Sequence, residues 1–492
     1  MRVSDLKIFD EDPKEPLKNF IDGEFVSARE TMDSIDPSTG KVWVKIPRSK
    51  DEDVNLAVKA AKAAFPSWSS STVQYRSSLL MKVAEIVEKN LEKIAILESR
   101  DQGKPINLAK RIDLPRCVHN FRFFATAILH HTAPSSHQDV PIRALNYVKH
   151  DPIGVAGLIS PWNLPLYLLS FKLAPALATG NTVVFKPSEL TSVTAWVLMH
   201  AFDEAGFPPG VVNMVIGTGA EAGEPLVIHP DVPLVSFTGS TIVGKRIGAL
   251  CAAQNKKVSL EMGGKNACIV YPSTDLEKAV PMITTSSFIN QGEICLCSSR
   301  VYVHETIFDN FLEKYVANAK KFTVGDPRGD FTLGAINSEL HYNKVMSYID
   351  LAVKEGGTIH CGGKVNVDGD CHDGYFIAPT IITGLDEKSK CVQDEIFGPV
   401  VCVMSFKTKE EVIDRANATP YGLSACVFSA LSDELHNTAS QLRVGTVWCN
   451  TWLTRDLNMP FGGTKQSGMG REGATDSFHF FTEQKTICIA LQ

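Results

Sequence analysis

The middle of the chain alternates between short apolar runs and longer segments with one apolar face. Between residues 152 and 271, the short runs predict strands, and apolar positions recurring every three or four residues predict helices between them. The predicted strands are 155–159, 182–186, 211–215, 234–238 and 258–261, and the predicted helices are 166–178, 191–205 and 242–252. This alternation is typical of a parallel, doubly wound α/β sheet.

A second alternating region follows residue 275. Its predicted helices lie near 277–290, 307–322, 339–354 and 409–416, and its predicted strands near 380–383, 400–406 and 446–449. Nearer the N-terminus, Asp22-Gly23 between apolar pairs predicts a hairpin, and residues 52–65 and 73–102 have helical periodicity. Residues 134–150 are predicted to be extended, and 485–491 to form a strand that could join the sheet edge of another subunit.

Size and composition indicate a multidomain protein of a reducing compartment. The 492 residues exceed one ordinary hydrophobic core, and twelve cysteines without regular spacing, behind an N-terminus with no apolar leader, favour a cytoplasmic location. The most apolar stretch, 164–178, is interrupted by Pro165, Lys172 and Pro175, so we expect no membrane span. A net charge of −6 without long Lys/Arg runs argues against a nucleic-acid partner.

Cys295 is the cysteine that we select as a candidate nucleophile. It lies between a predicted helix and a predicted strand, just after a helix break at Gly292. A thiol at such a junction can face a cleft, although most free cysteines are buried core residues. A metal site with Cys297 and His304 is the alternative, but the Cys-x-x-Cys pairs of zinc sites are absent and no fourth ligand is evident.

Polar residues and one glycine lie at or just after the ends of strands of the first predicted sheet. These positions are Asn163, Lys186, Gly239 and Glu261. Ligands of such sheets bind beyond the carboxyl ends of the strands, so this arrangement is a functional signal. The turn from Gly239 to Gly244 opens a helix whose N–H groups suit a pyrophosphate, although such turns are often purely structural. Lys186 and Glu189 either contact ribose hydroxyls or form a solvated ion pair.

Asn163, Glu261 and Cys295 form a chemically coherent set. Asn163 lies between Pro161 and Pro165, which restrict the backbone, so its amide can be a fixed donor. Glu261 precedes two glycines that allow a ligand to approach, and it is either a base or an ordinary loop acid. An amide donor, a carboxylate and a thiol are what acyl chemistry through a thiolate requires.

Ordered motifs along nearly the whole chain resemble the NAD(P)-dependent aldehyde dehydrogenase superfamily. The motifs are Pro161-Trp-Asn163, Lys186-Pro-Ser-Glu189, Phe237-Thr-Gly-Ser240, Leu260-Glu-Met-Gly-Gly-Lys265, the stretch around Cys295, Glu395-Ile-Phe-Gly-Pro399 and Pro460-Phe-Gly-Gly463. The resemblance implies an α/β fold with three domains and a homodimer or homotetramer. These domains are a Rossmann-type NAD-binding domain (1–128 and 152–263), an α/β catalytic domain (264–466) and a small β oligomerisation domain (129–151 and 467–492).

The resemblance also implies a role for each matched residue. Cys295 would attack the aldehyde carbon, Asn163 would hold the oxyanion, and Glu261 would activate water against the resulting thioester. Glu472 would assist proton transfer, and no metal is expected. The residues that would contact NAD are Ser160, Trp162, Lys186, Glu189, Gly239, Ser240, Gly244, Glu395 and Phe397. Glu189 favours NAD because the 2′-phosphate of NADP would meet like charge.

A closer resemblance concerns the substrate. Four segments resemble the subgroup of this family that oxidises 2-aminomuconic and 2-hydroxymuconic semialdehydes in tryptophan (kynurenine) and aromatic catabolism: 113–116, 120–124, 164–169 and 450–457. In that subgroup, the positions of Arg116 and Arg455 are proposed to bind the substrate's remote carboxylate, which suits guanidinium geometry. Each could instead form a salt bridge, Arg455 with Asp456 for example. An apolar aldehyde such as 9-cis-retinal is the alternative substrate, and a non-catalytic binding protein the alternative function.

Overall fold

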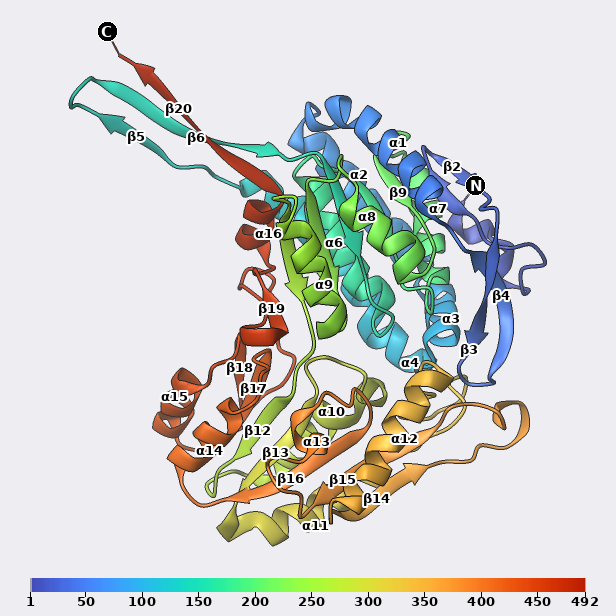
Figure 1. Ribbon diagram of the computed structural model, residues 1–492, viewed down its shortest axis with the longest axis vertical. Coiled ribbons are helices and arrows are strands. Elements are labelled where there is room, and N and C mark those ends of the chain that lie inside the picture. Colours follow the sequence, from blue (N-terminus) through green and yellow to red (C-terminus); the bar gives the residue numbers. More distant parts are fainter. Residues whose placement is uncertain (1, 492) are drawn as a thin grey trace.

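The computed structural model describes residues 2–491 and places them in four β-sheets, with helices packed around the two largest (Figure 1). The first sheet, in spatial order, contains β19 (Gly468–Met469), β11 (Lys257–Glu261), β10 (Leu234–Thr238), β7 (Val155–Ile159), β8 (Thr182–Lys186), β9 (Val212–Met214), β1 (Asn19–Ile21) and β2 (Glu24–Val26). Strands β7 to β11 run parallel, as the sequence predicts.

The register of the parallel strands brings their carboxyl ends to one edge. Lys186 pairs with Ile159, Ile159 with Phe237, and Phe237 with Leu260. Strands β8 and β9 lie on one side of β7, whereas β10 and β11 lie on the other. The loops that leave β7 and β10 therefore diverge, and a crevice for a ligand forms at such a switch point.

The second sheet has seven strands and carries the candidate nucleophile at the start of its central strand. In spatial order they are β14 (Thr358–Lys364), β15 (Ile377–Thr383), β16 (Val400–Phe406), β13 (Ser298–His304), β12 (Asn266–Val270), β17 (Ser424–Phe428) and β18 (Thr446–Cys449). All pair in parallel except β14 with β15. The sequence pattern does not predict β12, β14 or β17. Cys295 lies in the turn that leads into β13.

Helices flank both sheets (Figure 1). Those of the first half are α1 (Asp51–Ser69), α2 (Val73–Lys89), α3 (Leu91–Gln102), α4 (Ile106–Leu108), α5 (Leu114–Ala127), α6 (Pro165–Ala178), α7 (Val193–Ala205), α8 (Glu224–Ile228) and α9 (Thr241–Ala252). Those of the second half are α10 (Leu276–Phe288), α11 (Phe308–Ala319), α12 (Glu339–Lys354), α13 (Lys390–Gln393), α14 (Lys409–Asn417), α15 (Ser432–Gln441) and α16 (Ala474–Phe480). Within residues 2–491, none of them has the length and hydropathy that a membrane span requires.

Two of the differences between predicted and observed helices have a local cause. The predicted helix 73–102 is two helices, because Asn90 leaves helical geometry (φ −109°, ψ 12°) and its side chain donates to the Ile86 carbonyl at 2.8 Å. The predicted helix 277–290 ends at Phe288, because Ile289 leaves helical geometry (φ −54°, ψ 148°) and Asn290 then adopts a positive φ of 55°. Of the two asparagines, only Asn290 lies in the left-handed region, which residues other than glycine rarely adopt.

A three-stranded antiparallel arm projects from the body of the molecule (Figure 1). It contains β20 (Thr482–Ala490), β6 (Ala144–Pro152) and β5 (Ser135–Gln138), in that order. The predicted C-terminal strand is therefore present, and on one side it pairs with β6 of its own chain along its full length. Val140, at the tip of the arm, is 81% exposed, so the arm presents apolar surface to its surroundings.

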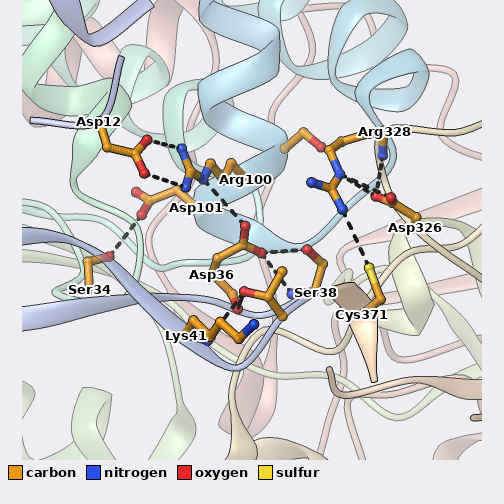
Figure 2. A network of polar contacts seen from close by, with 12 residues as sticks. Asp12, Ser34, Asp36, Ser38, Lys41, Arg100, Asp101, Asp326, Arg328 and Cys371 are labelled. Atoms are coloured by element: carbon orange, nitrogen blue, oxygen red, sulfur yellow. Dashed lines mark hydrogen bonds and ion pairs between the residues drawn. The ribbon is translucent and has the colours of Figure 1, made fainter. Parts of the chain in front are cut away.

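A polar network joins the N-terminal segment, the small sheet of β3 (Thr31–Asp36) and β4 (Lys41–Pro47), and the end of α3 (Figure 2). Arg100 pairs with Asp12 and, at 3.4 Å, with Asp36. Next to it, the buried Asp101 accepts a hydrogen bond from Ser34 at 3.0 Å. These contacts fix the end of α3, from which the chain continues toward the candidate active site.

His200 lies buried on α7 between two aromatic rings. It stacks on Phe25 (centroid distance 4.0 Å) and meets Trp196 edge to face at 4.4 Å. Neither ring nitrogen of His200 has a hydrogen-bond partner. Burial lowers the pKa of His200 to about 4, followed by a smaller effect of the N-terminal charge. The native state therefore binds the proton less tightly than the unfolded chain does.

The pKa of His200 is lower in the folded protein than in the unfolded chain. The stability gained by burying the neutral ring is therefore fully present above the pKa of the unfolded chain, and it is lost as the pH falls toward the pKa of the folded protein. We expect the free energy of unfolding to fall by about 2 kcal/mol more in the wild type than in His200→Phe between pH 7 and pH 5. Denaturant unfolding of both proteins at the two pH values measures this difference. Parallel pH dependences would contradict the assignment.

Candidate active site

A cavity of about 260 Å³ lies where the two α/β units face each other. Its lining includes many of the predicted site residues: Trp162, Asn163, Gly239, Ser240, Glu261, Cys295, Glu395, Phe397, Arg455 and Glu472. Apolar side chains complete the wall, namely Leu164, Tyr167, Leu168, Leu453 and Phe461. The predicted residues outside this lining are Ser160, Lys186, Glu189, Gly244 and Arg116. Residues far apart in the sequence thus meet around one space.

The main chain around Cys295 is held by side chains of other segments. Asn266 Nδ2 donates to the Cys295 carbonyl at 2.7 Å and to the Cys297 carbonyl at 2.9 Å. Trp452 Nε1 donates to the Leu296 carbonyl at 3.0 Å. Cys295 is partly exposed in the cavity, whereas Cys297 packs in the core. Cys295 is therefore the thiol that a molecule in the cavity can reach.

The alternative metal site finds no support in the geometry. The ring nitrogens of His304 contact Thr306 Oγ1 at 2.9 Å and the Lys407 carbonyl at 3.1 Å. Among residues 2–491, no cluster of three or more His, Cys, Asp or Glu side chains is arranged to hold a metal ion.

The Cys295 thiol lies in an environment that disfavours its ionisation. Burial raises the pKa of Cys295 above its usual value, and the negative charges of Glu395 and Glu261 raise it further, while Arg455 lowers it. The thiolate, rather than the thiol, is the nucleophilic form. A base within the cavity is therefore needed to make the sulfur reactive.

Asn163 contacts the nucleophile loop directly. Its Nδ2 donates one hydrogen to the Glu293 carbonyl at 2.8 Å, which leaves the second N–H for another acceptor. The main-chain carbonyl of Asn163 accepts hydrogen bonds from Lys104 Nζ at 3.1 Å and from Asn290 Nδ2 at 3.2 Å. Lys104 is fully buried and forms an ion pair with Asp113 at 2.6 Å. The predicted amide donor is thus fixed from both sides beside the thiol.

Glu261 is a buried carboxyl group with an oxygen that lacks a partner. Its Oε1 has no hydrogen bond. Burial and the negative charge of Glu472 raise the pKa of Glu261 well above its usual value, opposed by Lys172, Arg455 and Arg471. A carboxyl group whose pKa is shifted toward neutrality in a cavity suits general-base chemistry.

Lys172 is a site residue that the sequence interpretation missed. The sequence shows it only as an interruption of an apolar helix. In the structure it is 1% exposed, and its Nζ contacts Glu472 Oε1 at 3.0 Å and Ser236 Oγ at 2.9 Å. A buried lysine is almost always paired with an anionic or polar group. A lysine within so apolar a helix therefore indicates a buried partner, and the sequence could have been read in this way. Lys172 holds the carboxylate of Glu472 at the edge of the cavity.

The turn after β10 has the form of a pyrophosphate site. Ser240 caps the twelve-residue helix α9, and the exposed Val243 follows in its first turn. A Cβ on Gly244 would lie 2.3 Å from the Met262 sulfur, so glycine lets the helix approach the sheet closely. Lys186 Nζ contacts Glu189 at 3.1 Å and the Gly217 carbonyl at 2.9 Å. These features lie along one edge of the first sheet, as the sequence predicts: the glycines of the turn, the start of α9 and the ion pair of Lys186 with Glu189.

Glu395 and Phe397 form the wall between this turn and Cys295. Glu395 Oε1 accepts from Gly264 N at 2.9 Å, and a Cβ on Gly263 would overlap the same carboxylate. Phe397 has a positive φ of 61°, and its ring lies edge to face with Trp162 at 5.4 Å. Ser160 is buried beneath, and its N–H bonds to the Lys186 carbonyl at 3.3 Å.

Arg116 and Arg455 are half-buried residues, and two nitrogens of each guanidinium group are buried. In both, Nε and Nη2 lack a hydrogen-bond partner. Burial lowers the pKa of Arg116, and the positive charge of Arg455 lowers it further, which indicates that the two cations are close. Arg455 lies over the ring of Phe461 at 3.9 Å, and Arg116 over that of Tyr167 at 5.3 Å. Both of these rings line the cavity.

The salt bridge between Arg455 and Asp456 that the sequence suggests as an alternative does not form. Asp456 instead accepts hydrogen bonds from the main chain and the side chain of Asn458, at 2.9 and 3.0 Å. The side chain of Arg455 points toward the aromatic rings of Phe171 and Phe461. Neighbouring positions in the sequence thus direct their charges to different sides of the chain.

Comparisons with known proteins agree with this geometry. The aldehyde dehydrogenase family matches residues 25–487. The chain is 51% identical to a human 2-aminomuconic semialdehyde dehydrogenase over 96% of this chain and 98% of that protein. It is 41% identical to a Pseudomonas 2-aminomuconic 6-semialdehyde dehydrogenase over 96% of this chain and 98% of that protein.

Solved structures match the fold over the same length. An aldehyde dehydrogenase of Bacillus cereus in complex with NAD+ superimposes with a TM-score of 0.94 and 38% identity, covering 97% of each chain. An indole-3-acetaldehyde dehydrogenase of P. syringae, also in complex with NAD+, superimposes with a TM-score of 0.95 and 36% identity, covering 100% of each chain. The chain belongs to the aldehyde dehydrogenase family. The fold, the family and the oxidation of aldehydes predicted from the sequence are thereby confirmed.

The charges around Cys295 give a testable pH dependence. Glu395 makes the largest charge contribution to the raised pKa of this thiol, so Glu395→Gln is expected to lower the thiol pKa. We expect iodoacetamide to alkylate Cys295 two- to tenfold faster in Glu395→Gln than in the wild type at pH 8, as roughly one pKa unit would allow. Asp394→Asn, which removes a neighbouring charge not among the causes of the shift, is the control. Equal rates in all three proteins would contradict the electrostatic account.

Proposed function

We propose that this enzyme oxidises 2-aminomuconic semialdehyde to 2-aminomuconate, with NAD as the hydride acceptor. The observation that carries the substrate assignment is a pair of neighbouring arginines, Arg455 in the cavity lining and Arg116 over the ring of the lining residue Tyr167, each with a buried Nε and Nη2 that lack a hydrogen-bond partner. This substrate has a carboxylate remote from its aldehyde, and a guanidinium binds a carboxylate with two parallel hydrogen bonds. Relatives with about half of their residues identical carry this activity in their names.

NAD is the cofactor of this family fold, and the residues present fit it. The start of α9 at Ser240 offers free N–H groups to a pyrophosphate. Lys186 and Glu189 suit the hydroxyls of the adenosine ribose, and Glu395 those of the second ribose. The cavity that contains Gly239 and Ser240 also contains Cys295, so one ligand can extend from the helix start to the sulfur. When bound, NAD accepts a hydride.

The first half of the reaction forms a bond between sulfur and carbon. Glu261 takes the proton of the Cys295 thiol, directly or through water, and the thiolate attacks the aldehyde carbon. The aldehyde oxygen becomes an oxyanion, which the free N–H of Asn163 and the main-chain N–H of Cys295 stabilise. The oxyanion then re-forms a carbonyl group as hydride leaves the same carbon, and a thioester on Cys295 remains.

The second half releases the acid. Glu261 first passes the thiol proton to solvent; it then takes a proton from a water molecule, and the water oxygen attacks the thioester carbon. The bond from carbon to sulfur breaks, the carboxylic acid leaves, and Cys295 returns as a thiolate. Lys172 and Glu472, joined at 3.0 Å, provide the route by which the proton on Glu261 reaches solvent.

An apolar aldehyde such as retinal would fit the aromatic wall but not its charges. It would leave both guanidinium groups of Arg116 and Arg455 unpartnered in the presence of substrate. Buried charged groups without partners are costly, so the favourable interaction is gained only with an anionic substrate. The distal carboxylate therefore distinguishes the two substrate classes.

Substitution of the nucleophile and of the base tests both halves of the reaction. Cys295→Ala is expected to form no NADH, because no thiohemiacetal can form. Glu261→Gln is expected to turn over about 100-fold more slowly, because water is no longer activated, and to form its burst of NADH more slowly as well, because the same group deprotonates the thiol. Stopped-flow absorbance measures both. Steady turnover at the wild-type rate in Glu261→Gln would place the base elsewhere.

Removal of a guanidinium group tests the substrate. Arg116→Met should lower kcat/KM roughly 100-fold for 2-aminomuconic or 2-hydroxymuconic semialdehyde, the loss of a charge-assisted bidentate contact. It should leave kcat/KM for 9-cis-retinal and for hexanal unchanged within threefold. Arg116 is preferred to Arg455 because Arg455 also shifts the pKa values of Cys295 and Glu261. Equal losses on all substrates would refute the carboxylate contact.

The same proposal includes a cytoplasmic homodimer or homotetramer, with the domain boundaries stated above. Val140 and Ile142 on the arm are 81% and 61% exposed, and a partner subunit would cover them. Val140→Asp with Ile142→Asp is expected to reduce the mass measured by light scattering to that of a monomer. Leu340→Asp, at a position 84% exposed on α12, is the control and should retain the wild-type mass. A monomeric wild type would contradict the proposal.

A further inference from the structure

The chain just before Cys295 has an unusual backbone. Asn290, Gln291 and Gly292 have successive φ values of 55°, 56° and 71°, all in the left-handed region. Only glycine adopts this region without steric cost, so the conformation of the first two persists only if surrounding contacts impose it. A Cβ on Gly292 would lie 2.2 Å from the Gly398 carbonyl oxygen, so the turn has no room to relax on that side.

Glu293 is the residue that ties this turn to the rest of the molecule. Its side chain is fully buried, and it accepts N–H groups from three separate segments. Gln102 Nε2, at the end of α3, donates to Oε2 at 2.8 Å, and the main-chain N–H of Asn337 donates to Oε1 at 3.1 Å. Gln291 Nε2, within the turn itself, donates to Oε2 at 3.4 Å.

The main chain of Glu293 makes the contact that matters for catalysis. Its carbonyl accepts from Asn163 Nδ2 at 2.8 Å, which orients the amide assigned to the oxyanion. The side chain and the carbonyl of one residue thus fix the left-handed turn on one side and the Asn163 amide on the other. Cys295 follows two residues later, so its sulfur takes its position from the same turn.

The presence of a carboxyl group at Glu293 is not explained by stability alone. Burial raises the pKa of Glu293 to about 8, while its three N–H donors and the positive charge of Lys104 favour the ionised form. No cation pairs with it directly; the nearest histidine nitrogen, of His341, is 3.9 Å away, and burial lowers the pKa of His341 to about 4. A buried carboxyl group without an ion pair is a poor device for stability, so its place beside the nucleophile suggests a functional reason.

We propose that Glu293 is a positioning residue for thiol attack. Its carboxyl group holds the left-handed turn and thereby keeps the Cys295 sulfur and the Asn163 amide directed at the same carbonyl group of the substrate. The inference rests on the proposed function of Cys295 and Asn163. Glu293 touches neither substrate nor cofactor and acts only through these two residues.

Substitution of Glu293 should affect aldehyde attack far more than thiol accessibility. Glu293→Leu keeps the volume and removes all accepting oxygens, and we expect the rate of the NADH burst to fall at least 100-fold. The KM values for aldehyde and NAD should stay within threefold. Alkylation of Cys295 by iodoacetamide, which needs no oxyanion donor, should change less than tenfold. Glu293→Gln, which keeps one accepting oxygen, should restore the burst to within tenfold of the wild type.

Asp101→Asn is the matched control for the loss of a buried carboxylate. Asp101 precedes Gln102, is 1% exposed and accepts from Ser34 and from Val193 N, but it has no contact with the turn. Its variant should melt at a lower temperature and retain the wild-type burst. If Glu293→Leu fails to fold, Gln102→Leu, which removes the 2.8 Å donor, should still slow the burst about tenfold.

A wild-type burst in folded Glu293→Leu, or in Gln102→Leu where Glu293→Leu fails to fold, would overturn the inference. So would equal losses in Glu293→Leu and Glu293→Gln, or a parallel loss of burst and alkylation. With Cys295→Ala inactive, any of these results rejects the positioning role alone. NADH formation that survives in Cys295→Ala would instead reject the proposed function.

Discussion

The hydrogen bond from Asn163 to the Glu293 carbonyl joins the two α/β units close to Cys295, the proposed nucleophile. Asn163 belongs to the loop after β7 of the first sheet, and Glu293 to the turn before β13 of the second. Neither unit holds a complete site by itself. The distance between sulfur and amide donor therefore depends on how the two units are joined, and contacts from Lys104 and Gln102 maintain that junction.

Three carboxyl groups and one thiol share the cavity, and their mutual repulsion sets the chemistry. Glu261, Glu395 and Glu472 line the same space as Cys295. Lys172 contacts Glu472 and leaves one oxygen of Glu261 without a partner. If Lys172 instead paired with Glu261, the pKa of Glu261 would fall and the group would be a weaker base. The pairing of Lys172 with Glu472 rather than with Glu261 thus leaves Glu261 as the carboxyl group suited to the proposed role of base.

The residues that the sequence reveals share a local signal. Asn163 and Glu261 each follow a short apolar strand, and Cys295 lies where a helical pattern breaks before a strand. Such signals depend only on neighbours in the chain, so the doubly wound sheet and its polar edge could be predicted. Strands β12 and β17 were missed because short apolar runs do not distinguish a buried strand from a helix.

Lys172 and Glu293 could not be assigned in this way. Glu472, which pairs with Lys172, is 300 residues away from it in the sequence. Gln102, whose side chain donates to Glu293 at 2.8 Å, is 191 residues away from it in the sequence. Their roles arise from three-dimensional proximity, which no local pattern contains. The left-handed turn at Asn290 and Gln291 is similar, since its conformation is imposed by contacts rather than by residue preference.

The arrangement of Arg116 and Arg455 supports an anionic substrate over an apolar one by the same reasoning. Two guanidinium groups at close range repel each other, and burial among aromatic rings removes the water that would screen them. Aromatic faces offset part of this cost, but their attraction is weaker than that of a carboxylate. A site for a purely apolar aldehyde would be more stable without either arginine. Under the proposed substrate assignment, a carboxylate at the far end of the substrate turns the repulsion into binding energy, because one anion is shared by two cations.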